Sequence, residues 1–241
     1  MKNVRISVAM ATYNGEKYIY DQLNSIIKCL GKDDEIIISD DGSTDNTINI
    51  IKQFKDKRIK IFNGPKKGVI KNFENAISKC LGKYIFLSDQ DDIWNKNKIE
   101  KILKEFEKDS TLTLVMHDAI VKNADLSQKI FDSFFEFRKC KTGYFNNLYK
   151  NSYIGCCIAF KSEILKYILP FPIGIPMHDQ WIGLMNELIG KSRFINDKLI
   201  EYRRHDMNVS NFDRNNLLVM IKNRKILAIE TYRRYKKCKI K

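Results

Sequence analysis

KYIFLSDQDDIW, Lys83–Trp94, is the stretch of sequence that decides the fold. Its apolar run Tyr84–Leu87 has no polar alternation, which is typical of a strand buried on both faces in a parallel sheet. Asp89, Asp91 and Asp92 follow directly, where this strand is expected to end. Carboxylates this close repel one another, and a hard divalent cation such as Mg²⁺ or Mn²⁺ is the usual compensation. The local pattern alone also permits a solvated acidic loop in which Asp92 or a neighbour caps the next helix.

Upstream of this stretch, predicted strands alternate with helical patterns. The sequence predicts strands at residues 5–12, 35–39, 58–62 and 83–88, and the spacing of apolar residues predicts a helix after each of the first three. Such alternation indicates an α/β protein with a mostly parallel central sheet flanked by helices. Ligands of these sheets bind beyond the carboxyl ends of the strands. We therefore expect three strand-end segments to meet in one crevice: Thr12–Gly15, Asp40–Ser43 and Asp89–Asp92.

Two common phosphate-binding motifs are missing. The first strand–helix turn, ATYNGEKY at 11–18, lacks G-x-G-x-x-G, and the chain has no G-x-x-x-x-G-K-[ST]. A Rossmann dehydrogenase or a P-loop enzyme would need one of them. A nucleotide would therefore be held differently, with its base and ribose against the first two loops and its diphosphate on a cation.

The strand–helix alternation weakens after Trp94. The pattern predicts helices at 98–107 and after Asp179, a short helix capped by Ser162, and strands at 112–116, 153–160, 193–196 and 199–203. The segment 127–144 is rich in polar and aromatic residues, and its apolar residues show no clear helical or strand periodicity. Helical spacing returns from Leu217 to the end of the chain, with Lys and Arg between the apolar residues.

Composition limits the class of protein. With 241 residues, 44% of them hydrophobic, the chain can bury a large core. Its net charge of +14 favours an anionic partner, such as nucleic acid, anionic lipid or a phosphorylated substrate. No apolar run reaches the ~18–20 residues that cross a bilayer, and the first residues lack a signal-peptide pattern, so we expect a cytoplasmic protein. The six cysteines form no C-x-x-C pair, which argues against a zinc or redox motif.

Five stretches together resemble the family-2 glycosyltransferases, which have the GT-A fold. The closer resemblance is to the bacterial rhamnosyltransferase-like enzymes of capsule and O-antigen polysaccharide synthesis. The stretches are VAMATYNGEKYI (8–19), EIIISDDGSTDNT (35–47), YIFLSDQDDIW (84–94), MHDQWIG (177–183) and YRRHDMNVS (202–210). The resemblance implies a GT-A (Rossmann-like) domain at 1–212, with a nucleotide-sugar half at 1–94 and an acceptor half at 95–212. A basic helical tail would follow at 213–241.

The resemblance also implies roles in binding the donor. The family's base-binding Asp falls on Asp41, with Asp40 beside it. The cation ligand of the D-x-D motif falls on Asp91, and Asp89 would face the sugar or ribose. The base and ribose would lie against Thr12, Tyr13 and Asn14. Asp92 and His178 are candidates to support these groups without touching the cation, Mg²⁺ or Mn²⁺.

Asp179, in MHDQW, is the general base that the resemblance implies. It would take the proton of the acceptor hydroxyl as that hydroxyl attacks the anomeric carbon, and one direct displacement inverts that carbon. In the first turn of a helix, the dipole would favour its ionised form. The plain alternative for Asp179 is an N-cap. One of Arg203, Arg204 and His205 would contact the diphosphate, where leaving-group charge develops, and the alternative is a solvated basic turn.

The implied partners are a UDP- or dTDP-sugar donor and a glycan acceptor, free or linked to a polyprenyl diphosphate. The basic tail would then lie on the inner face of the plasma membrane, or else be an ordinary solvated helix. Two alternatives remain open. A nucleotidyltransferase would carry a Gly-rich, Arg/Lys-containing signature after the first strand, and a nucleic-acid-binding protein would not need the acidic strand-end loops. Nucleic acid is not an expected partner in the preferred interpretation.

Overall fold

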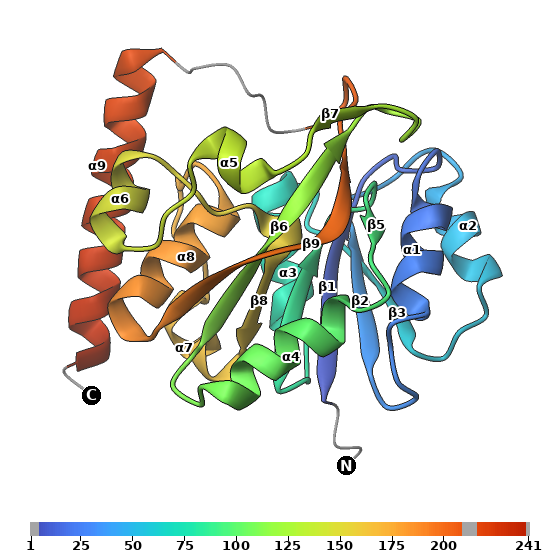
Figure 1. Cartoon of the computed structure of the whole chain (residues 1–241), viewed down its shortest axis with the longest axis horizontal. Helices are drawn as coiled ribbons and strands as arrows, with labels where there is room; N and C mark the ends of the chain where they lie inside the picture. The colour runs from blue at the N-terminus through green and yellow to red at the C-terminus, as the bar shows by residue number, and fades with distance from the viewer. Residues whose placement is uncertain (1–4, 209–215, 240–241) are drawn as a thin grey trace.

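One nine-stranded sheet organises the computed structural model, which describes residues 5–208 and 216–239 (Figure 1). The strand order is β3-β2-β1-β4-β8-β6-β9-β5, with β7 paired to β6. The strands are β1 (Ile6–Thr12), β2 (Glu35–Asp40), β3 (Ile59–Asn63), β4 (Tyr84–Ser88), β5 (Ile93–Trp94), β6 (Leu114–Lys122), β7 (Lys129–Phe131), β8 (Ile158–Lys161) and β9 (Ser192–Arg203).

The first four strands are parallel neighbours, as the sequence predicts. Every residue of β1, β2 and β4 is buried, which explains why these strands are apolar without alternation. Thr12 lies beside Asp40, and Met10 lies beside Ser88. The three strands therefore end at the same edge of the sheet, and the loops that follow them leave from that edge.

The second half of the sheet is mixed. β8 is antiparallel to both β4 and β6, whereas β9 is parallel to β6 and antiparallel to β5. The predicted strands 193–196 and 199–203 are one strand, β9, whose register against β6 shifts beside Asp118. The predicted strand 112–116 was wrong at both ends, because β6 runs from Leu114 to Lys122 with His117 and Asp118 buried inside it. The sheet is continuous across the predicted division at residue 94.

Helices cover both faces of the sheet. Figure 1 shows α4 in front of it, α3 behind it, and α6 to α9 gathered at the end away from α1 and α2. The helices are α1 (Ile19–Ile27), α2 (Thr47–Gln53), α3 (Val69–Ser78), α4 (Lys98–Lys108), α5 (Phe134–Arg138), α6 (Tyr144–Tyr149), α7 (Leu165–Ile168), α8 (His178–Ile189) and α9 (Leu217–Lys239). The segment without a clear period contains β7, α5 and the start of α6. Gly155–Cys157 is a 3-10 turn, so the predicted strand 153–160 begins only at Ile158.

The C-terminal helix α9 packs against α6, α7 and α8. Leu227 and Thr231 are buried in this contact, and the Tyr144 hydroxyl lies 2.7 Å from Thr231 Oγ1. The predicted tail is therefore helical where it is described, while 213–215 and 240–241 lie outside the described residues. Within 5–208 and 216–239, no helix is long and apolar enough to cross a membrane.

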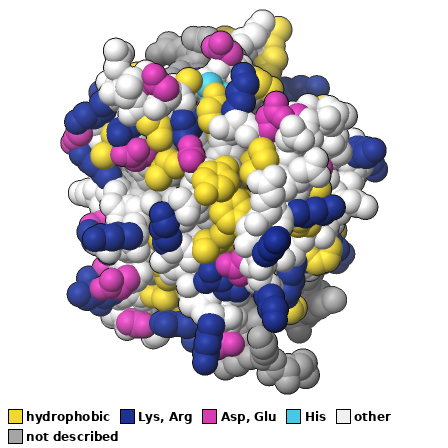
Figure 2. Space-filling model, turned by 90° about the vertical axis from the view of Figure 1, so that its right-hand side faces the viewer, with side chains coloured by type: hydrophobic (Ala, Val, Ile, Leu, Met, Phe, Trp, Pro, Cys, Tyr) yellow, Lys and Arg dark blue, Asp and Glu magenta, His cyan; other side chains and the backbone are white. Residues whose placement is uncertain are grey.

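The surface beside α1 and α2 carries charges of both signs. Figure 2 shows Lys and Arg side chains spread over this face, with Asp and Glu side chains among them and an apolar cluster near its centre. The net charge of +14 therefore does not gather into one basic patch on this face.

Candidate active site

A cavity of about 1130 Å³ lies at the edge where β1, β2 and β4 end. The three strand-end loops contribute to its lining, together with the start of α8 and the residues that follow β9. The predicted site residues that line it are Thr12, Tyr13, Asn14, Asp41, Asp89, Asp91, His178, Asp179 and His205. Asp40, Asp92, Arg203 and Arg204 are not among the lining residues.

The two aspartates after β2 have different surroundings. Asp40 is buried and accepts hydrogen bonds from the hydroxyls of Thr12 and Ser43, at 2.8 and 2.6 Å, so it organises the loop from inside. Asp41 lines the cavity, and its carboxylate accepts the backbone N–H groups of Lys66 and Gly68 at 2.6 and 2.7 Å. These bonds fix the loop before α3 as one rim of the cavity.

The loop after β1 forms the neighbouring wall. Tyr13 is 56% exposed and lines the cavity. Asn14 adopts a left-handed backbone conformation, with φ of 46°. Its N–H donates to Ser43 Oγ at 2.9 Å, and its Oδ1 accepts the Thr44 N–H at 2.8 Å. Asn14 therefore joins this wall to the loop after β2.

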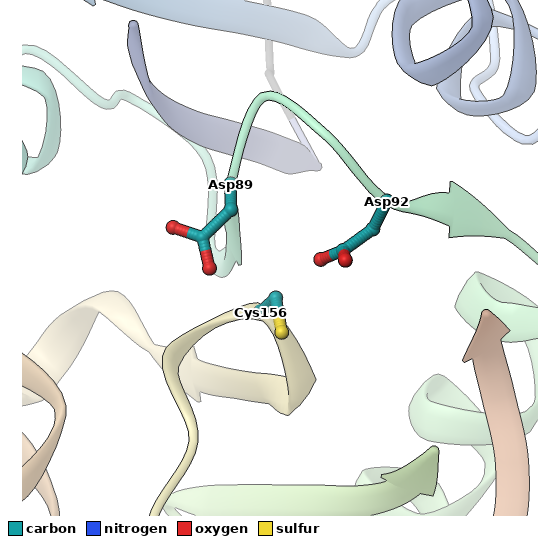
Figure 3. A group of neighbouring side chains, drawn as sticks. All are labelled: Asp89, Asp92 and Cys156. Carbon is teal, nitrogen blue, oxygen red and sulfur yellow. The ribbon is translucent and has the colours of Figure 1, made fainter. Parts of the chain in front are cut away.

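The acidic loop after β4 places Asp89 and Asp92 above the 3-10 turn. Figure 3 shows both carboxylates directed toward Cys156, and one ligand atom of each residue lies within 4.8 Å of the others. Burial raises the pKa of Asp89 to about 7, helped by the charges of Asp91 and Asp179. Burial also raises the pKa of Asp92, whose Oδ1 accepts the Arg203 N–H at 3.0 Å, while Oδ2 has no hydrogen-bond partner in the part of the chain that the structure describes.

Asp91 points to a different set of partners. His205 Nε2 lies 2.8 Å from Asp91 Oδ2, and the Asn208 side-chain amide donates to the same oxygen at 3.3 Å. The His205 ring stacks on the Tyr18 ring, with 4.6 Å between centroids. Asp91 and His205 therefore form a pair on the cavity wall.

The carboxylates on the cavity wall fit a hard divalent cation. Mg²⁺ and Mn²⁺ prefer carboxylate oxygens, which Asp89 and Asp91 present to the cavity. A cation would also offset the repulsion from neighbouring carboxylates that adds to burial in raising the pKa of Asp89. The Cys156 thiol is a poor candidate ligand, because burial raises its pKa well above the ordinary value and keeps it protonated.

Asp179 is buried in the first turn of α8, on the wall that faces the acidic loop. Its Oδ1 accepts the Gln180 N–H at 2.6 Å, and the Gly155 N–H also bonds to the carboxylate. Burial outweighs these bonds and raises the pKa of Asp179 to about 7. The expectation that the helix dipole keeps this group ionised was therefore wrong. The N-cap alternative was also wrong, since Met177 is the N-cap.

His178 lies beside Asp179 but has a different environment. Its ring stacks on Phe73, with 4.0 Å between centroids. Burial lowers the pKa of His178 to about 3, so the imidazole is neutral near pH 7. Neither ring nitrogen has a hydrogen-bond partner among the described residues.

The two arginines after Tyr202 are not among the residues that line the cavity. Arg203 is buried behind the acidic loop, where its Nε donates to the Asp91 carbonyl oxygen at 2.7 Å and its guanidinium lies over the Tyr18 ring. The Arg204 N–H donates to the Lys122 carbonyl oxygen at 2.8 Å. Among the three predicted diphosphate contacts, His205 is the one that lines the cavity.

Sequence reasoning missed several residues of the site. Lys17, Lys66 and Asn208 line the cavity, and Lys66 follows a Gly-Pro turn that marks a loop. Lys98 is fully buried under the acidic loop, where its Nζ donates to the Cys156 carbonyl oxygen at 2.7 Å and lies 3.9 Å from the Trp94 ring centroid. Burial lowers the pKa of Lys98 to about 8. A lysine with these neighbours holds the 3-10 turn in place beneath the carboxylates.

Comparison with known sequences gives one family. The family model described as "Glycosyl transferase family 2" matches residues 7–169. The UDP-Glc:alpha-D-GlcNAc-diphosphoundecaprenol beta-1,3-glucosyltransferase WfgD of Escherichia coli is 30% identical over 192 residues, which cover 78% of this chain and 72% of that protein. The dTDP-rhamnosyl transferase RfbG of Shigella flexneri is 45% identical over 102 residues, which cover 39% of this chain and 35% of that protein.

Solved structures show the same fold. S. aureus TarS 1-349 in complex with UDP-GlcNAc superposes with a TM-score of 0.73 at 19% identity, over 94% of this chain and 66% of that chain. The mannosyltransferase PcManGT from Pyrobaculum calidifontis, in complex with GDP-Man and Mn²⁺, gives a TM-score of 0.58 at 19% identity, over 80% of this chain and 55% of that chain. The chain thus spans about two thirds or less of RfbG and of both structures.

Proposed function

Because the chain belongs to glycosyl transferase family 2, we propose that it moves a sugar, with inversion, from a nucleoside diphosphate to a hydroxyl of a growing cell-surface glycan. The observation that carries this proposal is one cavity lined both by the D-x-D carboxylates Asp89 and Asp91 and by Asp179. Asp89 and Asp179 line the same cavity, and the charge of Asp179 adds to the effect of burial in raising the pKa of Asp89. An acid-rich donor site and a separate base are what this reaction requires.

The donor would lie along the three strand-end loops. Tyr13 and Asp41 would hold the base and ribose, and Lys17 or Lys66 would lie near the phosphates. Asp91, with Asp89 and His205 beside it, would hold an Mg²⁺ or Mn²⁺ ion. When bound, this ion supplies Lewis-acid stabilisation of the charge on the departing nucleoside diphosphate.

Asp179 would act as the general base. It takes the proton of the acceptor hydroxyl while the hydroxyl oxygen forms a bond to the anomeric carbon and the bond to the diphosphate breaks. Attack and departure occur on opposite faces of the sugar, so the anomeric configuration inverts. The raised pKa of Asp179 places its ionisation near neutral pH, where a general base is most effective.

We also propose a lipid-linked acceptor and contact with an anionic membrane. The relative WfgD is named for a diphosphoundecaprenol substrate. On α9, an exposed stripe recurs at helical spacing and combines apolar and cationic residues: Leu218, Ile221, Lys225, Ile229, Tyr232 and Lys236. Residues 216–239 contain eight Lys or Arg and one Glu. Such a stripe can lie in the interface of an anionic bilayer, where each cation contributes ~1 kcal/mol.

Two substitutions that introduce negative charge on α9 test the membrane contact. The double variant Leu218→Glu/Ile221→Glu should sediment with phosphatidylglycerol vesicles about tenfold less than the wild type, because it removes apolar area and adds negative charge. The matched control is Leu81→Glu/Ile130→Glu, which changes two apolar side chains that are also exposed but lie away from α9. Equal sedimentation of the α9 variant and the control would contradict the contact.

A donor panel tests the proposed function itself. Titration calorimetry with UDP-glucose, UDP-N-acetylglucosamine, dTDP-rhamnose and GDP-mannose, each with and without Mn²⁺, should show Mn²⁺-dependent binding of a UDP- or dTDP-sugar. NMR of the product formed from that donor should show the inverted anomer. Tight Mn²⁺-independent binding of an oligonucleotide, without a response to any nucleotide sugar, would contradict the proposal and favour a nucleic-acid-binding protein.

A further inference from the structure

The middle residue of the D-x-D motif, Gln90, contacts the adjacent wall of the cavity, which the loop after β1 forms. Its Oε1 accepts the Tyr13 N–H at 2.9 Å, and its Nε2 donates to the Tyr13 carbonyl oxygen at 3.0 Å. One side chain therefore satisfies both backbone polar groups of Tyr13. The Gln90 side chain also lies close to Gly15, since a Cβ at Gly15 would lie 2.4 Å from Gln90 Oε1.

These two bonds join segments that are far apart in the sequence. Tyr13 follows β1, whereas Gln90 follows β4, 77 positions later. On its other side, the loop after β1 is already bonded to the loop after β2, because the Asn14 N–H donates to Ser43 Oγ at 2.9 Å. Gln90 supplies the corresponding connection to the acidic loop, so all three strand-end loops are linked by hydrogen bonds.

Tyr13 needs such a connection because its ring is not held by the core. With 56% of the residue exposed, packing alone fixes the ring weakly. The position of the Tyr13 backbone sets the position of the Cα atom from which the ring extends. A bidentate contact at that backbone sets the position of the ring relative to Asp89 and Asp91, the neighbours of Gln90 in the chain.

We propose that Gln90 is a positioning residue for donor binding: it holds Tyr13 so that the nucleoside contacts this wall while the diphosphate reaches Asp89 and Asp91. The inference rests on the proposed function. It assigns Gln90 no contact with the donor or the cation, and its effect passes through Tyr13.

A double-mutant cycle tests this role. Gln90→Met keeps the length of the side chain and removes both hydrogen bonds, so it should weaken binding of UDP or dTDP in the presence of Mn²⁺ about tenfold. In a Tyr13→Ala background, the same substitution should cost less than about twofold. Binding of Mn²⁺ alone and the turnover number should stay within about twofold, because the carboxylates and Asp179 are unchanged.

Two further variants sharpen the test. Gly15→Ala places a methyl group against the Gln90 amide, so it should displace that side chain and weaken nucleotide binding to a similar extent. Gln53→Met makes the same chemical change at an exposed position of α2 and should have no effect. Melting curves of all variants report whether each one folds.

The possible failures are distinguishable. If the wild type binds neither UDP nor dTDP with Mn²⁺ present, the proposed function is wrong and this inference falls with it. If the wild type binds and Gln90→Met binds equally well, the inference alone is overturned. An equal loss with and without Tyr13 would also overturn it, because Gln90 would then act by a route other than Tyr13.

Discussion

Replacing Asp179 with Asn is expected to lower the turnover number about 10²–10⁴-fold while donor affinity stays within about twofold. The amide can still accept the Gln180 N–H, so the first turn of α8 is preserved, but it cannot take a proton from the acceptor. Because burial penalises the ionised carboxylate, the variant should melt no lower than the wild type above neutral pH. Steady-state transfer assays and donor titration measure the two effects.

The pH dependence of the same reaction is the companion measurement. A base with a pKa of about 7 is mostly protonated and inactive in mildly acidic solution, so kcat/KM should rise with pH and level off above about 7. The assay needs saturating Mn²⁺, because the pKa of Asp89 is also raised to about 7 and a bound cation keeps that group ionised. Asp179→Asn should lack this limb of the profile. Full transfer activity in Asp179→Asn would remove Asp179 from the base role.

Asp91→Asn should remove most of the benefit that Mn²⁺ gives to donor binding. In the wild type Asp91 offers a carboxylate to the cavity, and its loss should weaken the affinity for Mn²⁺ about 100-fold or more. Binding of the nucleoside alone, without phosphates, should be unchanged because Tyr13 and Asp41 remain. Calorimetric titration with Mn²⁺, followed by UDP or dTDP, measures both quantities.

The control for Asp91→Asn is Asp33→Asn, which makes the same change in the exposed loop between α1 and β2. It should bind Mn²⁺ and nucleotide like the wild type. If Asp91→Asn also responds to Mn²⁺ like the wild type, the cation is held elsewhere. The carboxylate pair Asp89 and Asp92, which lie together above Cys156, would then be the next candidate.

The fold of the first half was predictable because burial leaves a direct trace in its sequence. Strands β1, β2 and β4 are buried on both faces, so their apolar runs are uninterrupted. Burial does not reveal the direction of a strand, however, since β8 in the second half is also buried along most of its length but runs antiparallel to β4. The length of β6 was hidden because Asp118 looks like the end of a strand. Inside the fold, its carboxylate instead accepts the Ser133 hydroxyl at 2.6 Å and the Phe135 N–H at 2.9 Å.

Within the site, sequence reasoning found the segments but could not choose between adjacent residues. Successive side chains of an extended chain point to opposite sides, so Asp40 turns into the loop while Asp41 lines the cavity. Arg203, the last residue of β9, lies behind the acidic loop, whereas His205, two residues further along and outside the strand, faces the cavity. The second of these choices depends on the register of β9, which no local pattern specifies. The contact between Gln90 and Tyr13 could not be predicted either, because it depends on how the loops after β1 and β4 meet.

The late position of β9 in the chain has a consequence for biosynthesis. β9 pairs with β5, the strand that directly follows the acidic loop. Soon after β9 comes His205, which lies 114 positions from its partner Asp91 in the sequence. On a translating ribosome the N-terminal part emerges and folds first, but the Asp91 side of the proposed donor site cannot form until β9 has emerged. A nascent chain that ends before β9 would therefore expose the three carboxylates without their closing strand. We therefore expect the proposed donor site to become complete only after β9 and His205 have left the ribosome.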